Sequence, residues 1–244
     1  MNIAVIFAGG VGKRMHSKSL PKQFLNIHGK PIIIHTLEHF ERHEEIDAIV
    51  VACAEPWMEY FHALLEEYRI KKVRRVVPGG ETGQLSIFHG LEAAEKLVQE
   101  AGCTGKSIVL IHDGVRPLIH PQLLSDNIEC VRKYGSAITA GVVTESIAVV
   151  NEQLDVEFIP SRANSRVAKA PQSFWLDEIL SVHESALADG NDSTIDSCTL
   201  MALYGKKLHM IDGPAENIKI TTPDDFFMMR SILESRENRQ IYGF

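Results

Sequence analysis

Four short segments of the chain are nearly continuous in apolar residues and rich in Val and Ile, namely residues 2–8, 48–54, 73–78 and 107–112. Strands buried on both faces of a parallel sheet show this pattern, whereas a strand with one solvated face alternates apolar and polar residues. The pattern therefore predicts the inner strands of a parallel sheet.

Helical periodicity separates these strands. Apolar residues recur at three-residue spacing at Ile34, Leu37 and Phe40 within residues 31–43, and a longer series of the same kind marks residues 82–101. Strand and helix thus alternate along the first half of the chain. This alternation predicts an α/β fold, a Rossmann-like domain with a mainly parallel central sheet and helices on both faces.

The second half of the chain adds further elements. The pattern predicts helices at residues 122–134, 177–188 and 197–204, strands at residues 136–143 and 207–212, and a last helix that begins near Pro223. Between them the pattern weakens, because polar residues interrupt short apolar stretches, and this predicts a projecting hairpin or arm at approximately residues 144–170. We expect residues 1–244 to form a single domain with this arm.

Composition narrows the classes of function. With 45% hydrophobic residues, a chain of 244 residues can bury a substantial core. Its net charge of −7 argues against sequence-independent binding of DNA or RNA, which needs a field of Lys and Arg. No apolar run approaches the roughly 18 residues of a membrane-spanning helix, and the first residues lack the pattern of a signal peptide, so we expect a cytoplasmic protein without a membrane partner. The four scattered cysteines predict neither a zinc site nor a disulfide framework.

The stretch AGGVGKRM, residues 8–15, directly follows the first predicted strand. Its glycines allow a sharp turn that brings backbone N–H groups up to an anionic ligand, and Arg14 and Lys22 would add positive charge. The stretch matches neither the dinucleotide fingerprint nor the P-loop, which argues against NAD enzymes and ordinary ATPases. The glycines alone are equally typical of a tight turn with two solvated cations.

A second motif, HDGVRP at residues 112–117, lies at the carboxyl end of a predicted parallel strand. Ligands of open α/β sheets bind outside these strand ends, where a carboxylate can hold a metal ion that is bound to phosphates. Asp113 is therefore the candidate metal ligand. The alternative is an Asp that only caps its own turn.

A third motif, ENIKITTPDD at residues 216–225, predicts a strand followed by the start of a helix, with Thr222 as the N-cap. In a strand, the neighbours of Lys219 would point away from it, so its ammonium could face a site while Ile218 and Ile220 pack. Taken alone, this motif favours the alternative of an exposed lysine on an edge strand.

Together these stretches resemble the cytidylyltransferase family that includes 2-C-methyl-D-erythritol 4-phosphate cytidylyltransferase and ribitol-5-phosphate cytidylyltransferase. Besides the three motifs above, the family's order along the chain is matched by PKQF at residues 21–24, GGE at 79–81 with Ser86 downstream, and APQSF at 170–174. The resemblance implies an enzyme that transfers CMP from CTP to a small polyol phosphate and releases pyrophosphate, with Mg²⁺ as cofactor. The implied acceptor is 2-C-methyl-D-erythritol 4-phosphate or D-ribitol 5-phosphate, and the AGG loop with the run GKPIIIHTLEHF at residues 29–40 looks slightly more like the ribitol enzymes.

The resemblance also implies roles for individual residues. The implied nucleotide site consists of Ala8, Gly9, Gly10, Gly12, Gly80, Ser86 and Asp113. The implied catalytic cations are Arg14 at the triphosphate, Lys22 at the α-phosphate and Lys219. The implied acceptor contacts are Ser146, Arg162 and Lys219. Asp113 would bind Mg²⁺, with Glu216 as a possible second ligand, and the arm that carries Ser146 and Arg162 would reach the site of the neighbouring subunit in a homodimer.

Two positions depart from the family pattern. Gly83 stands where members often carry Arg, and Ala170 where they often carry Thr, which affects the nucleotide loop and the acceptor pocket.

Two other functions stay open on the sequence. One is a sugar-phosphate nucleotidyltransferase that uses UTP or dTTP, and the other is a non-catalytic nucleotide-binding protein of the same fold.

Overall fold

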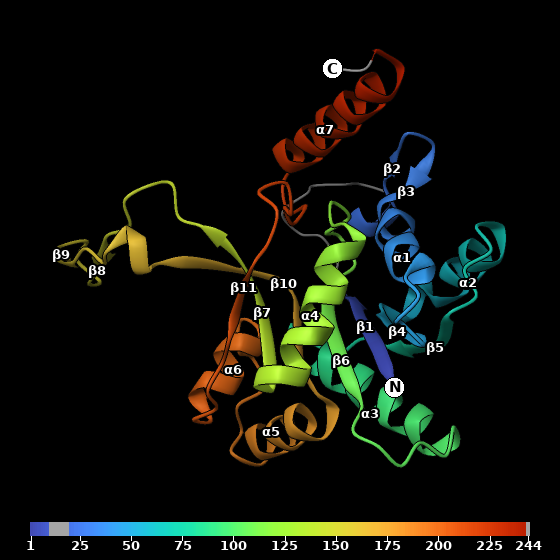
Figure 1. The fold of residues 1–244 in the computed structure, drawn as a ribbon, viewed down its shortest axis with the longest axis horizontal. Coiled ribbons are helices and arrows are strands. Elements are labelled where there is room, and N and C mark those ends of the chain that lie inside the picture. The colour runs from blue at the N-terminus through green and yellow to red at the C-terminus, as the bar shows by residue number, and fades with distance from the viewer. Residues whose placement is uncertain (10–19, 243–244) are drawn as a thin grey trace.

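The computed structural model describes residues 1–9 and 20–242. Within them, one sheet contains the seven strands β1 (Asn2–Ala8), β4 (Ala48–Cys53), β5 (Val73–Pro78), β6 (Ile108–Asp113), β7 (Ser136–Val142), β10 (Arg166–Trp175) and β11 (Met210–Asp212). Their order across the sheet is β11-β7-β10-β6-β1-β4-β5 (Figure 1). β10 runs antiparallel to its neighbours β6 and β7, and the other pairs are parallel. The predicted, mainly parallel α/β sheet is confirmed. The prediction that residues 73–78 are buried on both faces is wrong, because β5 is an edge strand and none of its residues is fully buried.

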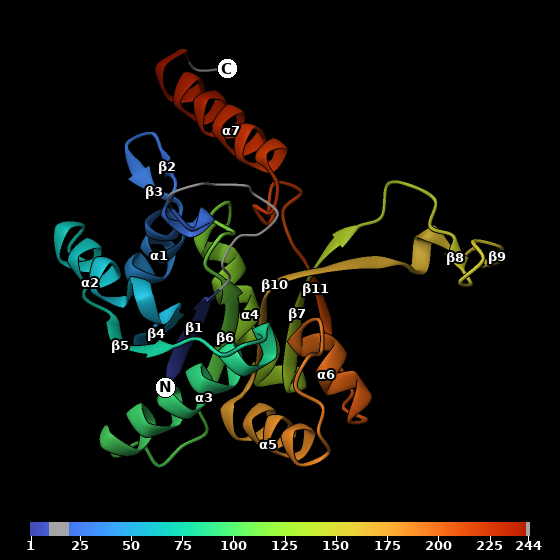
Figure 2. The same cartoon turned by 180° about the vertical axis from the view of Figure 1, so that it is seen from behind.

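Helices cover both faces of the sheet. One face carries α1 (Ile32–Arg42), α2 (Met58–Glu67) and α4 (Pro121–Tyr134), and the other carries α3 (Gly83–Glu100), α5 (Leu176–Ala188) and α6 (Ser197–Leu203) (Figures 1 and 2). In β1, Ile3 and Val5 pack into one core, and Ala4 and Ile6 pack into the other, which explains why residues 3–8 are all apolar. A strand between two helical layers has no solvated face.

The last helix, α7 (Pro223–Tyr242), stands apart from both layers (Figure 1). It packs through Met229 onto a small third core that contains Val115, Leu118 and Ile220. Its start is capped as predicted, because the Asp225 carboxylate accepts hydrogen bonds from the backbone N–H groups of Thr221 and Thr222, each at 2.8 Å, and Thr222 Oγ1 accepts one from Asp225 N at 3.4 Å. This cap fixes the direction in which the chain leaves the segment before α7.

The predicted arm is present and projects from the sheet (Figures 1 and 2). It contains a short hairpin of β8 (Val149–Val150) and β9 (Val156–Phe158), followed by the 3-10 turn η4 (Arg162–Asn164). The sequence did not predict that the returning chain forms β10, a ten-residue strand that continues from the arm into the middle of the sheet. Its pairing with β7 shifts register between Ala168 and Gln172, a bulge that redirects the side chains at this point.

Smaller elements complete the fold. They are the 3-10 turns η2 (Lys22–Phe24) and η3 (Glu55–Trp57) and the hairpin of β2 (Asn26–Ile27) and β3 (Lys30–Pro31). The strand predicted at the beginning of residues 216–225 is wrong, because this segment is irregular and Ile220 N makes one backbone hydrogen bond, at 2.9 Å, to Val115 O. Among the described residues, no helix is both long and apolar enough to cross a membrane.

Candidate active site

Two adjoining cavities open at the carboxyl ends of β1 and β6. The glycine cavity, with a volume of 420 Å³, lies against Ala8, Gly9, Lys22, Gly80 and Ser86. The inner cavity, with a volume of 210 Å³, lies between β10, α3, α5 and α6. Both cavities share a wall formed by Phe7, Gly83, Asp113 and Lys219. A group bound in one cavity therefore faces a group bound in the other across this wall.

Backbone packing at the glycine cavity depends on the absence of side chains. A Cβ atom on Gly80 would lie 2.3 Å from the Cβ of Leu85, and one on Gly9 would lie 3.1 Å from Ser86 Oγ. Ser86, in the first turn of α3, accepts a hydrogen bond of 3.0 Å from Gly80 N and donates one of 2.9 Å to Thr82 O. The glycine segment, residues 79–81, is thus held close to the N-terminal end of α3, where the positive end of the helix dipole favours anions.

The predicted nucleotide residues Ala8, Gly9, Gly80, Ser86 and Asp113 all line the glycine cavity, as does Lys22. Gly10, Gly12 and Arg14 lie outside the described residues. Gln23 was not predicted as part of the site. Its buried side chain donates a hydrogen bond of 2.7 Å to Ala8 O, which fastens the turn that carries Lys22 to the end of β1. The motif PKQF contained this residue, but nothing in its pattern distinguished a bridging role from an exposed glutamine.

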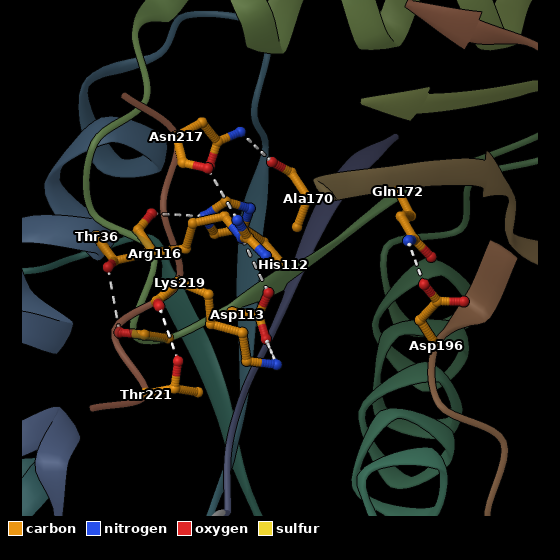
Figure 3. A network of polar contacts seen from close by, with 11 residues as sticks. Thr36, His112, Asp113, Arg116, Ala170, Gln172, Asp196, Asn217, Lys219 and Thr221 are labelled. Carbon is orange, nitrogen blue, oxygen red and sulfur yellow. Dashed lines mark hydrogen bonds and ion pairs between the residues drawn. The ribbon is translucent and has the colours of Figure 1, made fainter. Parts of the chain in front are cut away.

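Asp113 is buried between two cations on the shared wall (Figure 3). Lys219 Nζ lies 2.5 Å from its Oδ1, and Arg116 Nε lies 3.1 Å from its Oδ2. Burial by itself raises the pKa of this carboxyl, but the charges of Lys219 and Arg116 outweigh it and lower the pKa to about 2. Asp113 is therefore ionised at neutral pH, and its charge holds both cations at the junction of the cavities.

A network of backbone contacts positions these cations (Figure 3). Arg116 Nη1 donates a hydrogen bond of 3.0 Å to Asn217 O, and Asn217 Nδ2 donates one of 2.7 Å to Ala170 O. The chain around Lys219 is thereby tied both to the end of β6 and to β10. Ile220 is buried, as expected, although the segment is not a strand. Arg116 and Asn217 belong to recognised motifs, but their structural role depends on contacts distant in sequence that periodicity cannot reveal.

The inner cavity is lined by polar side chains that the sequence did not single out. Gln172 on β10 donates to Asp196 Oδ2 at 3.2 Å and accepts from Cys198 N at 2.7 Å. Gln84 on α3 donates to Asn191 O at 2.7 Å and accepts from Thr194 N, also at 2.7 Å. These contacts fix the segment before α6 over the cavity.

Lys169 also lines the inner cavity, at the bulge of β10. Its Nζ lies 3.4 Å from Pro214 O and 3.3 Å from Ala215 O, and its side chain crosses Gly141, where a Cβ would lie 2.8 Å from Lys169 Cε. Partial burial lowers the pKa of Lys169, and the charge of Arg116 lowers it further. This cation was missed because the weak pattern of the arm concealed the strand on which it lies.

Three predicted residues lie elsewhere. Glu216 is paired with Arg236 on α7 and does not line either cavity, so the structure does not bring it together with Asp113. Ser146 and Arg162 are exposed on the arm, where Arg162 Nη1 donates a hydrogen bond of 3.2 Å to Thr144 O. Within residues 1–9 and 20–242, no cluster of three or more His, Cys, Asp and Glu side chains could hold a metal ion.

The chain is similar to known proteins in both sequence and fold. The family described as IspD, 2-C-methyl-D-erythritol 4-phosphate cytidylyltransferase, matches residues 2–235. The ribitol-5-phosphate cytidylyltransferase of Streptococcus agalactiae serotype V is 52% identical, with 100% of this chain and 99% of that protein covered. The 2-C-methyl-D-erythritol 4-phosphate cytidylyltransferase of Clostridium botulinum (strain Langeland) is 36% identical, with 96% and 97% covered.

Among solved structures, the 4-diphosphocytidyl-2C-methyl-D-erythritol synthase of Anaerococcus prevotii superimposes with a TM-score of 0.81 at 28% identity, and 96% of each chain is covered. Fold and sequence therefore agree along nearly the whole length of the protein. The resemblance inferred from the motifs is confirmed, and the chain belongs to the IspD family of cytidylyltransferases.

Proposed function

We propose that this cytidylyltransferase transfers CMP from CTP to D-ribitol 5-phosphate and releases pyrophosphate. The observation that carries the proposal is the pair of cavities that meet at Asp113 and Lys219, since a reaction between two phosphates needs two sites that share cations. The choice of acceptor is supported by the identity of 52% to a protein named for ribitol 5-phosphate, against 36% to one named for methylerythritol phosphate.

In this proposal the glycine cavity binds CTP. Ala8 and Gly9, with Gly10, Gly12 and Arg14, surround the triphosphate, while Gly80 and Ser86 contact the base. Lys22 lines the same cavity and neutralises the α-phosphate. Gly83 also lies on the shared wall, and a Cβ there would meet no atom within 4 Å.

The acceptor occupies the inner cavity in this proposal. Its phosphate would lie near Lys219 on the shared wall and Lys169 at the bulge, which supply the positive charge that a dianion requires in an acidic protein. The hydroxylated chain would then extend toward Gln172 and Asp196. Lys169 is an addition to the acceptor residues expected from the sequence.

The proposed chemistry needs charge neutralisation rather than proton transfer. An acceptor phosphate oxygen attacks the α-phosphorus of CTP and forms a new P–O bond. The bond between the α-phosphorus and the oxygen that bridges the α- and β-phosphates breaks, and this oxygen leaves with pyrophosphate. A phosphate monoester has a second pKa of about 6, so its oxygen is already anionic at neutral pH and needs no general base. Lys22 and Lys219 would hold the two anions in line and reduce their repulsion.

Asp113 also fits the implied Mg²⁺. Magnesium is commonly held by one or two carboxylates together with substrate phosphates, and a single ionised carboxylate on the wall between the cavities suits that arrangement. A carboxylate has further lone pairs beyond those that Lys219 and Arg116 engage. When bound, the ion would supply positive charge to the triphosphate. Glu216 is not proposed as a ligand, because it pairs with Arg236.

We also propose a homodimer in which the arm of one subunit completes the acceptor site of the other. The support is that the arm exposes apolar side chains, including Leu154 at 78% and Phe158 at 56%, and that it carries Ser146 and Arg162 away from the cavities. Mixing two inactive variants, Arg162→Ala and Lys219→Met, should restore activity, because one of the two sites in the mixed dimer has both residues. A mixture as inactive as its components would contradict an arm that acts between subunits.

The acceptor is tested by assaying pyrophosphate release with CTP and either D-ribitol 5-phosphate or 2-C-methyl-D-erythritol 4-phosphate. The proposal expects a higher kcat/KM with ribitol 5-phosphate, and a preference for methylerythritol phosphate would overturn the choice. UTP and dTTP in place of CTP test the nucleotide. Binding of CTP without pyrophosphate release across polyol phosphates would instead indicate a non-catalytic protein.

A further inference from the structure

Two buried polar side chains that line the inner cavity have no hydrogen-bond partners among the described residues. His183 on α5 is 1% exposed, and neither ring nitrogen has a hydrogen-bond partner among the described residues. Ser197, at the start of α6, is 2% exposed, and its Oγ also has none. Both residues line the cavity. Buried polar groups are nearly always paired, so such a pair in a cavity wall indicates a partner that enters the cavity.

The surrounding polar groups differ from these two, because they already bind one another. Gln84 bonds Asn191 and Thr194, and Gln172 bonds Asp196 and Cys198. They form a fixed frame. The ring of His183 is held in place by stacking on Phe88, with ring centroids 6.0 Å apart and an interplanar angle of 18°. The His183 ring is therefore held in position by this stacking.

The chemistry of the two groups identifies their partner. Burial lowers the pKa of His183 to about 4, so its imidazole is neutral at physiological pH and offers one donor and one acceptor. Ser197 offers a hydroxyl that can do both. This set complements an alcohol group, which also donates and accepts, and it lacks the charge that would recognise a phosphate or carboxylate. A cavity of 210 Å³ suits a short hydroxylated chain.

We propose that His183 and Ser197 hydrogen-bond a hydroxyl group of the acceptor's polyol chain, and thereby select acceptors that carry a hydroxyl at that carbon over those that carry hydrogen or methyl. This inference rests on the proposed function, which places the acceptor in the inner cavity. In this role the two residues determine specificity, because they contact the polyol chain and not the reacting phosphate. An acceptor that lacks the hydroxyl would leave both groups unpaired.

The test compares wild type with His183→Phe, which keeps an aromatic ring against Phe88 but removes both nitrogens. Ribitol 5-phosphate and its singly deoxygenated analogues are assayed with CTP at saturation. For wild type we expect one analogue to lose at least about tenfold in kcat/KM. With ribitol 5-phosphate, the kcat/KM of the variant should be lower than that of wild type by a similar factor. With that analogue, the kcat/KM of the variant should equal that of wild type. The KM for CTP should not change. Equal losses with every acceptor, or no loss, would overturn the inference.

A second variant covers the case in which His183→Phe does not fold. Ser197→Ala removes only one oxygen and should weaken discrimination against the same analogue. Matched controls are His62→Phe on α2 and Ser185→Ala on α5, since both residues are exposed and line neither cavity, and neither change should alter discrimination. If discrimination is unchanged in Ser197→Ala and wild type treats all deoxygenated analogues alike, a bound water satisfies the two groups and the inference fails.

The outcomes also separate this inference from the proposed function. If wild type uses ribitol 5-phosphate but the variants discriminate as it does, the hydroxyl-recognition role fails while the function stands. If wild type turns over no polyol phosphate, both fail.

Discussion

Lys219 Nζ lies 2.5 Å from Asp113 Oδ1, and the two side chains together form part of the wall between the cavities. They differ in accessibility, because the carboxylate is buried whereas the side chain of Lys219 is 40% exposed. The Asp113 carboxylate thus holds the ammonium group of Lys219 in place, and Lys219 is the residue of the pair that can contact a ligand. This arrangement explains how an acidic protein keeps positive charge at its proposed reaction centre.

Asp113→Asn should raise the Mg²⁺ concentration needed for half-maximal turnover. The amide keeps the shape of the side chain but removes the negative charge that would attract the ion and that holds Lys219 and Arg116. A magnesium titration of pyrophosphate release measures the effect. Asp126→Asn on α4, at a half-buried position that lines neither cavity, serves as the control. A titration curve that matches wild type would remove Asp113 from metal binding.

Lys22→Ala should leave the fold intact and lower kcat by roughly 10²–10³, the range found when one preorganised charge-stabilising donor is lost. The side chain lines the glycine cavity, where we place the α-phosphate. Pyrophosphate release gives the rate, and thermal unfolding checks the fold. Lys71→Ala, an exposed change before β5, provides the comparison. Near-normal turnover would exclude Lys22 from the mechanism.

Gly80→Ala should destabilise the glycine segment and weaken CTP binding, because the added Cβ would lie 2.3 Å from Leu85 Cβ and 2.9 Å from Leu85 C. Overpacking of this kind costs about 1–3 kcal/mol. Gly105→Ala is a matched control, since a Cβ there meets nothing within 4 Å. Urea unfolding and the KM for CTP measure the two effects. Equal behaviour of the two variants would show that the segment relaxes freely.

The free energy of unfolding should fall as the pH drops from about 6.5 to about 4. Burial lowers the pKa of His183 to about 4, so in this window the unfolded chain binds a proton at His183 that the folded protein does not. Protons bound in excess by the unfolded state make stability rise with pH. His183→Phe should lose less stability than wild type over the same interval. Urea titrations at both ends of the window test this, and parallel losses would contradict a buried neutral imidazole.

The strands of the sheet were predictable where both faces are buried. Residues 3–8 of β1 and 108–111 of β6 are continuous apolar runs because helices pack on both sides of them. β10 was missed because its first half lies in the arm and its sequence mixes polar residues with Pro171. Local pattern cannot show that such a segment enters the middle of a sheet.

Only the part of the candidate site that consists of motif residues was predictable from the sequence. Ala8, Gly80, Ser86, Asp113 and Lys219 do gather around adjoining cavities, because parallel strands bring loops of distant sequence to one edge. The inner cavity was not foreseen. His183 lies on the buried face of α5, where an apolar residue is usual. It stands out only because neither of its ring nitrogens has a hydrogen-bond partner among the described residues. Such an absence of partners has no signature in sequence.

β10 gives the arm and the inner cavity a common backbone. Because successive residues of a strand face opposite sides, removing one residue between 166 and 169 would turn the outer half of β10 over relative to Gln172. Changes of arm length are therefore tolerable at the tip, near the turn between β8 and β9, and harmful near the sheet. A change of length at that outermost turn therefore leaves the register of β10, and with it the position of Gln172 in the inner cavity, unchanged.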